Sequence, residues 1–169
     1  MRCGLIRQQK PLKRLILNFK LLNVNIKTDL ETISLNESTI FGQLYFQDGD
    51  FYFPSKDWNE FIIIVLNWWC QSLLNLLEEK TFSEELDFMD GPFSVRVNLI
   101  EGSIYNFYFK KDDEILKKDE VDLLSFTKEF LKQVNALLRY TANFNIINDC
   151  ELDSLKNNYN KLQSKLKAT

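Results

Sequence analysis

The amino-acid sequence predicts an α+β fold: an antiparallel sheet of about five or six strands in two meanders, two long helices on one face and a short C-terminal helix. Two groups of short segments with alternating apolar side chains are each divided by tight-turn residues. Long segments in which apolar side chains recur at helical spacing follow each group. Strands joined by tight turns pair antiparallel, and helices this apolar must cover one face of a sheet.

The chain is long enough for one domain, which we expect to span residues 14–169. Its 169 residues contain no internal repeat, low-complexity linker or Pro/Gly-rich boundary, and the length is usual for a single domain. Residues 1–13 hold four basic side chains and no acidic one. We therefore predict a flexible basic arm that precedes the domain.

The first strands are predicted from alternation and turn residues. Residues 14–27 alternate with a change of phase near Leu21, which favours a long strand with a bulge. Residues 39–53 favour a hairpin, because Asp48-Gly49 suits a two-residue type I′ turn. That turn would place two aromatic or apolar pairs opposite each other, Phe46 with Phe51 and Leu44 with Phe53.

A long helix is expected over residues 57–79. Asp57 and Glu60 form a D-x-x-E variant of the capping box, which satisfies the first free N–H groups of a helix. The run at residues 61–66 has strand propensity, but no Gly or Pro follows before Gly91 and the apolar residues keep helical spacing. These apolar residues are Trp58, Phe61, Ile62, Val65, Trp69, Leu73, Leu76 and Leu77.

The second meander is predicted between residues 88 and 117. Turn residues at 89–92, 101–103 and 111–113 divide it into strands, the last of which is short and lies around Ile115 and Leu116. The alternating core residues are Val95, Val97 and Leu99 in one strand and Tyr105, Phe107 and Phe109 in the next.

Two helices are expected to complete the chain. Residues 121–147 carry two adjacent apolar stripes, and leucines spaced by three and four between Leu152 and Leu166 form a narrow seam of the coiled-coil type. The seam is too short to be stable alone. We expect it to dock on the body of its own chain; the alternative is a partner helix, which would make the protein a homodimer.

The charges are distributed unevenly. The formal net charge is −3, but residues 1–14 carry +5 and the remainder −8. An acidic body repels phosphate groups, so direct nucleic-acid binding is not expected.

The apolar segment 61–77 is interrupted by polar side chains, which favours a core helix over a membrane span. Without a secretory signal or a regular cysteine framework (Cys3, Cys70 and Cys150), a reduced, cytoplasmic protein is expected.

Enzyme chemistry finds little support in the sequence. Histidine is absent, which removes Ser/His and Cys/His nucleophile pairs and the usual proton shuttle. The five glycines are too dispersed for a phosphate-binding loop, and Cys70 lies in an apolar segment that raises the pKa of a thiol. We therefore expect a non-enzymatic protein with no catalytic residue, no cofactor and no metal.

Two acidic groups are the candidate partner-binding residues. A calcium loop carries a glycine midway between its ligands, but in the first group Gly91 follows the acids. We therefore expect the first group to lie in a solvated loop. The second is expected at a hairpin turn, where Asp is favoured. The first group is Glu84, Glu85, Asp87 and Asp90, and the second is Asp112, Asp113 and Glu114.

Three tyrosines are further candidates for partner binding. Tyr45, Tyr52 and Tyr108 alternate with predicted core residues, so we expect them on the opposite face of the sheet. Tyrosines exposed on one face are typical of protein-binding surfaces. The alternative is that a helix or loop covers them.

Two segments resemble a pattern found in small bacterial immunity proteins that accompany polymorphic or contact-dependent toxins. These segments are FYFPSKDWNEFIIIVLNWW at 51–69 and FMDGPFSVRV at 88–97. The resemblance implies a cytoplasmic domain without catalytic residues that neutralises a toxin by tight binding. The acidic body agrees with a basic toxin domain as partner, because opposite fields speed encounter. The alternatives are an assembly protein that oligomerises through its C-terminal helix and an enzyme with a metal held by the first acidic group.

Overall fold

The structure is a computed structural model that describes residues 24–37, 39–144 and 150–169. These residues form eight strands and three helices, which confirms the α+β class. The elements are β1 (Asn25–Asn36), β2 (Thr39–Asp48), β3 (Phe51–Phe53), β4 (Asn59–Glu60), α1 (Ile62–Leu77), β5 (Ser83–Asp87), β6 (Phe93–Glu101), β7 (Ile104–Lys111), β8 (Glu114–Asp122), α2 (Leu123–Thr141) and α3 (Cys150–Ala168).

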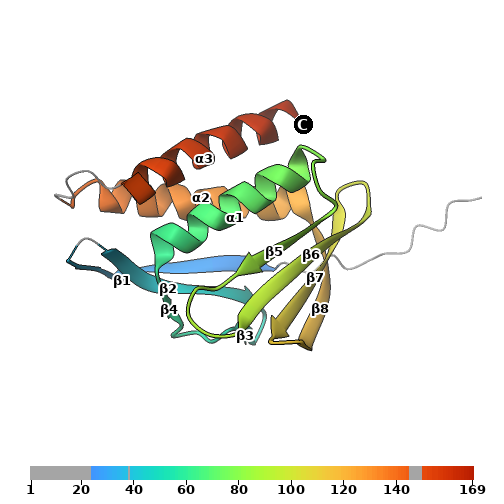
Figure 1. The fold of residues 1–169 in the computed structure, drawn as a ribbon, viewed down its shortest axis with the longest axis horizontal. Coiled ribbons are helices and arrows are strands. Elements are labelled where there is room, and N and C mark those ends of the chain that lie inside the picture. Colours follow the sequence, from blue (N-terminus) through green and yellow to red (C-terminus); the bar gives the residue numbers. More distant parts are fainter. Residues whose placement is uncertain (1–23, 38, 145–149) are drawn as a thin grey trace, which may run out of the picture.

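The strands form two antiparallel sheets rather than the one that we expected. In the first sheet the order is β1-β2-β3, with β4 also paired to β2, and in the second it is β5-β6-β7-β8. The chain leaves the first sheet through α1 and begins the second with β5, so each meander is a separate sheet. The three helices lie on the same side of both sheets (Figure 1).

The first strand of the described residues, β1, begins at Asn25. The predicted basic arm and most of the predicted strand at 14–27, including the bulge near Leu21, lie outside the described residues. Strand β1 has its own irregularity further along, where its register with β2 shifts between Asp29 and Ser34.

The β2–β3 hairpin is confirmed, but its register differs from the prediction by two residues. Phe46 pairs with Phe53 and Asp48 with Phe51, so the two turn residues are Gly49 and Asp50. Gly49 has a φ of +57°, a left-handed conformation that glycine adopts without a steric penalty. Because the shift is an even number of residues, Phe46 and Phe53 still share the buried face.

Helix α1 begins at Ile62, five residues after the predicted start. Asn59 and Glu60 pair with β2 instead, and no side chain caps the first turn of the helix. The predicted capping box is therefore wrong, because the Glu60 carboxylate is buried and used elsewhere. The apolar run at 61–66 is almost wholly helical, which confirms that its spacing outweighs its strand propensity.

The second meander is confirmed at β6 and β7, where the alternating residues are buried except Leu99, which is half-buried. Two of its neighbours differ from the prediction. Residues 83–87 form strand β5 rather than a loop, and β8 extends to Asp122. The Asp122 side chain accepts a hydrogen bond from the Ser125 backbone N–H and caps α2, which ends at Thr141 rather than near residue 147.

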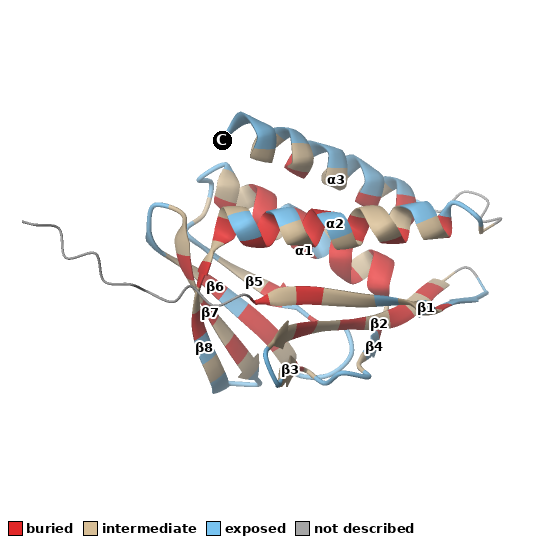
Figure 2. Cartoon of the chain, turned by 180° about the vertical axis from the view of Figure 1, so that it is seen from behind, coloured by how far each residue is buried: buried red, intermediate tan, exposed pale blue. Residues whose placement is uncertain are grey.

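The C-terminal helix α3 is as long as α2, at 19 residues, and is not short as predicted. Its seam docks on its own chain, as expected: Leu152, Leu155 and Leu162 are buried, and α3 packs against α1 and α2. The outward side of α3 is exposed (Figure 2). The seam is therefore occupied within the molecule, which removes the observation that favoured assembly through this helix.

One hydrophobic core joins both sheets to the helices. The Phe46 ring on β2 lies 5.2 Å from the Trp69 ring of α1, 5.6 Å from the Phe109 ring of β7 and 6.1 Å from the Phe126 ring of α2. Among the described residues, no helix has the length and apolar character needed to cross a membrane.

Candidate protein-binding surface

The first acidic group does not form one site, because three of its members, Glu84, Glu85 and Asp87, lie on strand β5. Successive side chains of a strand point to opposite faces. The Glu84 carboxylate accepts hydrogen bonds from Asn75 Nδ2 of α1 at 3.1 Å and from Thr81 Oγ1 at 2.7 Å. Glu85 points to the outer face of the second sheet. A solvated loop that presents all four acids together is therefore ruled out.

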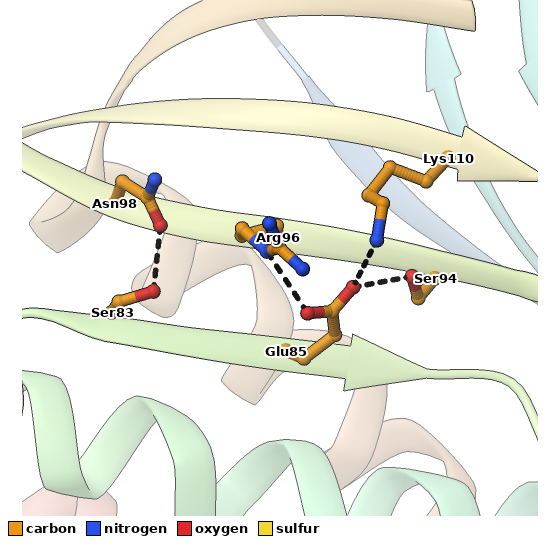
Figure 3. A network of polar contacts seen from close by, with 6 residues as sticks. All are labelled: Ser83, Glu85, Ser94, Arg96, Asn98 and Lys110. Carbon is orange, nitrogen blue, oxygen red and sulfur yellow. Dashed lines mark hydrogen bonds and ion pairs between the residues drawn. The ribbon is translucent and has the colours of Figure 1, made fainter. Parts of the chain in front are cut away.

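Glu85 is neutralised by neighbours on its own sheet (Figure 3). Its carboxylate accepts hydrogen bonds from Ser94 Oγ at 2.6 Å, Arg96 Nε at 3.0 Å and Lys110 Nζ at 3.1 Å. Burial raises the pKa of Glu85, but these three contacts outweigh it and hold the pKa below its ordinary value. Glu85 therefore stabilises the sheet and contributes little free negative charge.

Turns of the second sheet meet at one end of the molecule. Phe93, at the start of β6, pairs with Lys111 at the end of β7, which pairs with Glu114 at the start of β8. The Asp112 backbone N–H also donates to the Pro92 carbonyl oxygen at 2.7 Å. The turns before β6 and between β7 and β8 are therefore neighbours (Figure 1).

The first sheet reaches the same end through two contacts. The Trp58 ring packs against the Phe93 ring with centroids 5.0 Å apart, which brings the 54–58 connection beside the turn before β6. Lys117 Nζ of β8 forms an ion pair with Asp48, next to the β2–β3 turn, and another with Asp119 at 2.6 Å. Four connections, two from each sheet, thus share this end.

Exposed carboxylates are concentrated on these connections and on the adjoining strand ends. We name this surface the acidic end. Lys56 and Lys111 are exposed cations on the same connections and strand ends. Sequence reasoning found five of the seven acids but missed Asp50 and Asp57, because nothing local shows which turns come together. The acidic end consists of Asp50, Asp57, Asp87, Asp90, Asp112, Asp113 and Glu114.

Asp87 links the acidic end to the neutralised Glu85. Burial raises the pKa of Asp87, and the neighbouring negative charge of Glu85 raises it further, against a smaller opposing effect of Lys110. Because burial is the largest cause, the raised pKa reflects the partly enclosed position of Asp87 at the end of β5.

The three candidate tyrosines point outward as expected but do not share one sheet. Tyr45 and Tyr52 lie half-buried on the outer face of the first sheet, with ring centroids 6.0 Å apart. Tyr108 lies on the outer face of the second sheet, where Lys118 Nζ is 5.5 Å from its ring centroid. The first pair adjoins the β2–β3 turn, since Tyr52 pairs with Gln47 beside it.

A residue that the sequence suggested only as part of a helix cap holds the acidic end in place. Glu60 is 0 % exposed. Its Oε1 accepts a hydrogen bond from the Phe61 N–H at 3.0 Å, and its Oε2 accepts from Trp58 Nε1 at 3.2 Å and from the Met89 and Asp90 N–H groups at 3.1 and 3.3 Å. The carboxylate thus ties the start of α1 to the turn before β6.

Metal and thiol chemistry gain no support from the geometry. In the part of the chain that the structure describes, no group of three His, Cys, Asp or Glu side chains could hold a metal ion. Cys70 is buried, and burial raises the pKa of its thiol, which disfavours the nucleophilic thiolate. Cys150 is exposed.

Comparison with known proteins matches this chain to no family model, no curated protein and no solved structure. The resemblance of residues 51–69 and 88–97 to immunity proteins therefore stays a prediction. The function is argued below from the surface itself.

Proposed function

We propose that this chain is a non-enzymatic, cytoplasmic protein-binding module of the immunity type, which inhibits a basic toxin domain by covering its functional surface. The acidic end is the observation that carries this proposal. Seven exposed carboxylates, on four connections and the adjoining strand ends, lie at one end of a two-sheet scaffold. A preformed acidic surface attracts a basic partner and accelerates its association.

The tyrosine pair beside the β2–β3 turn supplies the second component of such an interface. Charges at the rim of an interface mainly steer encounter, whereas partly buried aromatic side chains contribute most of the binding energy. Tyr45 and Tyr52 are half-buried and in ring contact, so they are already ordered before binding. Little conformational entropy is then lost when a partner covers them.

Removing three charges from the acidic end is expected to weaken partner binding about tenfold, at about 0.5 kcal/mol for each exposed charge. The variant is Asp90→Asn/Asp112→Asn/Asp113→Asn. Asparagine tolerates the left-handed conformation of Asp112, whose φ is +53°, so the fold is retained. The loss of affinity should come mainly from a lower association rate, and it should be smaller at high salt. Binding to the surface-immobilised partner measures the affinity, and stopped-flow mixing measures the association rate.

The matched control removes three exposed charges elsewhere, Glu31→Gln/Glu101→Gln/Asp153→Asn. It gives the same net charge, so it separates the local surface from the overall field. Equal losses in the two triple variants, or none in either, would contradict a role for the acidic end.

Immunity itself has a separate test. The products of the reading frames adjacent to this one are expressed singly in a bacterial host, and growth is measured with and without the chain. We expect one of them to arrest growth, the intact chain and the control variant to restore it, and the acidic-end variant to restore it poorly. If no adjacent product is both toxic and neutralised, the immunity assignment is wrong.

A further inference from the structure

A cavity of about 550 Å³ opens at the end of the second sheet opposite the acidic end. It lies where the C-terminus of α1, the start of α2 and the β6–β7 turn meet, and Leu76, Leu99 and Leu123 form much of its wall. Phe82 stands beside it and is 65 % exposed. The volume lies within the range of small-molecule sites, and an apolar lining with few polar groups is typical of them.

Tyr105 brings an unpaired polar group into this cavity. The residue is 5 % exposed and lines the cavity, yet no hydrogen bond joins its hydroxyl to any group among the described residues. Burial and, to a lesser degree, the charge of Glu79 raise the pKa of Tyr105, and both residues line the cavity. The hydroxyl is not among the enclosed polar atoms that lack a partner, so it is accessible from the cavity and can form a hydrogen bond to a ligand there.

Glu79 holds a carboxylate beside the same cavity in a conformation that costs energy. Its N–H donates to the Leu76 carbonyl oxygen at 3.1 Å and the Lys80 N–H donates to that of Asn75 at 3.0 Å, the pattern of a Schellman motif, in which the left-handed residue is usually Gly. Glu79 takes that position with a φ of +57°. The hydrogen bonds of the motif hold Glu79 in this conformation.

Glu79 is also the one charged side chain among the described residues that line the cavity. Its carboxylate is exposed and forms no ion pair within the described residues. The cavity therefore presents a leucine wall, the Tyr105 hydroxyl and the Glu79 carboxylate. The hydroxyls of Ser103 and Thr169 also line it, but they already donate to the Asp122 carboxylate and the Lys165 carbonyl oxygen.

We propose that this cavity binds a small amphipathic amine. The apolar body packs against the leucine wall and Phe82, and the ammonium donates one hydrogen bond to the Tyr105 oxygen while it faces the Glu79 carboxylate. An alkyl carboxylate of the same shape would meet Glu79 with like charge. The site is remote from the acidic end, so it neither depends on the immunity assignment nor supports it.

Three probes with the same alkyl chain test the proposal: n-octylamine, n-octanol and octanoate. Amide shifts of the full chain, labelled with ¹⁵N, are followed as each probe is added at neutral pH. We expect saturable shifts around Leu99 and Tyr105. Octylamine should bind about threefold to fivefold more tightly than octanol, as a partly exposed ion pair provides, and octanoate should bind most weakly.

The variants separate ligand binding from stability. Glu79→Gly relieves the left-handed strain, so it is expected to raise the unfolding midpoint while it abolishes the preference for octylamine over octanol. Tyr105→Phe is expected to weaken octylamine and octanol alike, about twofold to tenfold, the value of one hydrogen bond. Glu101→Gln, an exposed control that does not line the cavity, should change neither.

Three results would overturn the proposal. They are the absence of saturable octylamine shifts around the cavity, binding of octanoate as tight as that of octylamine, and an unchanged preference for octylamine in Glu79→Gly.

Discussion

Replacement of Phe46 by alanine lowers the free energy of unfolding by about 3–5 kcal/mol, the usual cost of removing a buried phenylalanine ring. Phe46 is 0 % exposed, and its ring contacts α1, α2 and β7 at once. No single neighbour can move into the space without losing its own contacts, so the cavity stays open. Urea unfolding followed by tryptophan fluorescence measures the change.

Phe82→Ala is the matched control for this substitution. It removes the same ring from a largely exposed position, so it should change the free energy of unfolding by less than about 0.5 kcal/mol. A cost below about 1 kcal/mol for Phe46→Ala would show that one core does not join the two sheets.

Replacement of Glu60 by alanine is expected to cost about 3 kcal/mol or more. It leaves four N–H groups without their acceptor, and each buried donor left unpaired costs about 1–3 kcal/mol, less where water can enter. Glu60→Gln keeps an oxygen that can face the three donors on Oε2 and should cost less, about 1 kcal/mol. Glu114→Ala, at an exposed position in the acidic end, is the control and should cost little.

The pH dependence of the same substitution has a definite sign. Burial raises the pKa of Glu60 above its ordinary value of 4.5, although its hydrogen bonds oppose that effect. A group whose pKa is raised in the folded state stabilises the fold fully below its unfolded pKa, and that stabilisation is lost as pH rises through the folded pKa. The stability difference between the wild-type chain and Glu60→Ala should therefore narrow as pH rises above 4.5. A stability difference that widens as pH rises would mean that the hydrogen bonds to Glu60 lower its pKa by more than burial raises it.

Local patterns predicted the elements whose residues alternate or repeat cleanly. The alternation of Val95 and Val97 and of Phe107 and Phe109 identified β6 and β7, because one face of each strand is buried. The leucine seam of α3 was similarly visible, and so was its docking. These patterns depend only on which face of an element is buried, and the spacing of apolar residues in the sequence reflects that directly.

Features set by tertiary contacts could not be predicted in the same way. Asp57 and Glu60 have the spacing of a helix cap, and only the position of the Met89 and Asp90 N–H groups shows why Glu60 turns inward. The β2–β3 register depends on which residue takes the left-handed conformation, and both Asp48-Gly49 and Gly49-Asp50 satisfy the local pattern.

The sequence predicted only part of the candidate surface, for the same reason. Acidic residues were identified at two turns, but the neighbouring positions of Asp50 and Asp57 follow from the Lys117–Asp48 ion pair and the Trp58–Phe93 ring contact. Glu84 and Glu85, adjacent in sequence, are separated by the pleat of β5.

Hydrogen–deuterium exchange of the chain, alone and bound to the adjacent-frame product that it neutralises, tests the proposed binding surface most directly. The account predicts that slowed exchange on binding is concentrated at residues 49–58, 89–92 and 111–114, the connections of the acidic end. Slowed exchange confined to α2 and α3, with these connections unchanged, would contradict it.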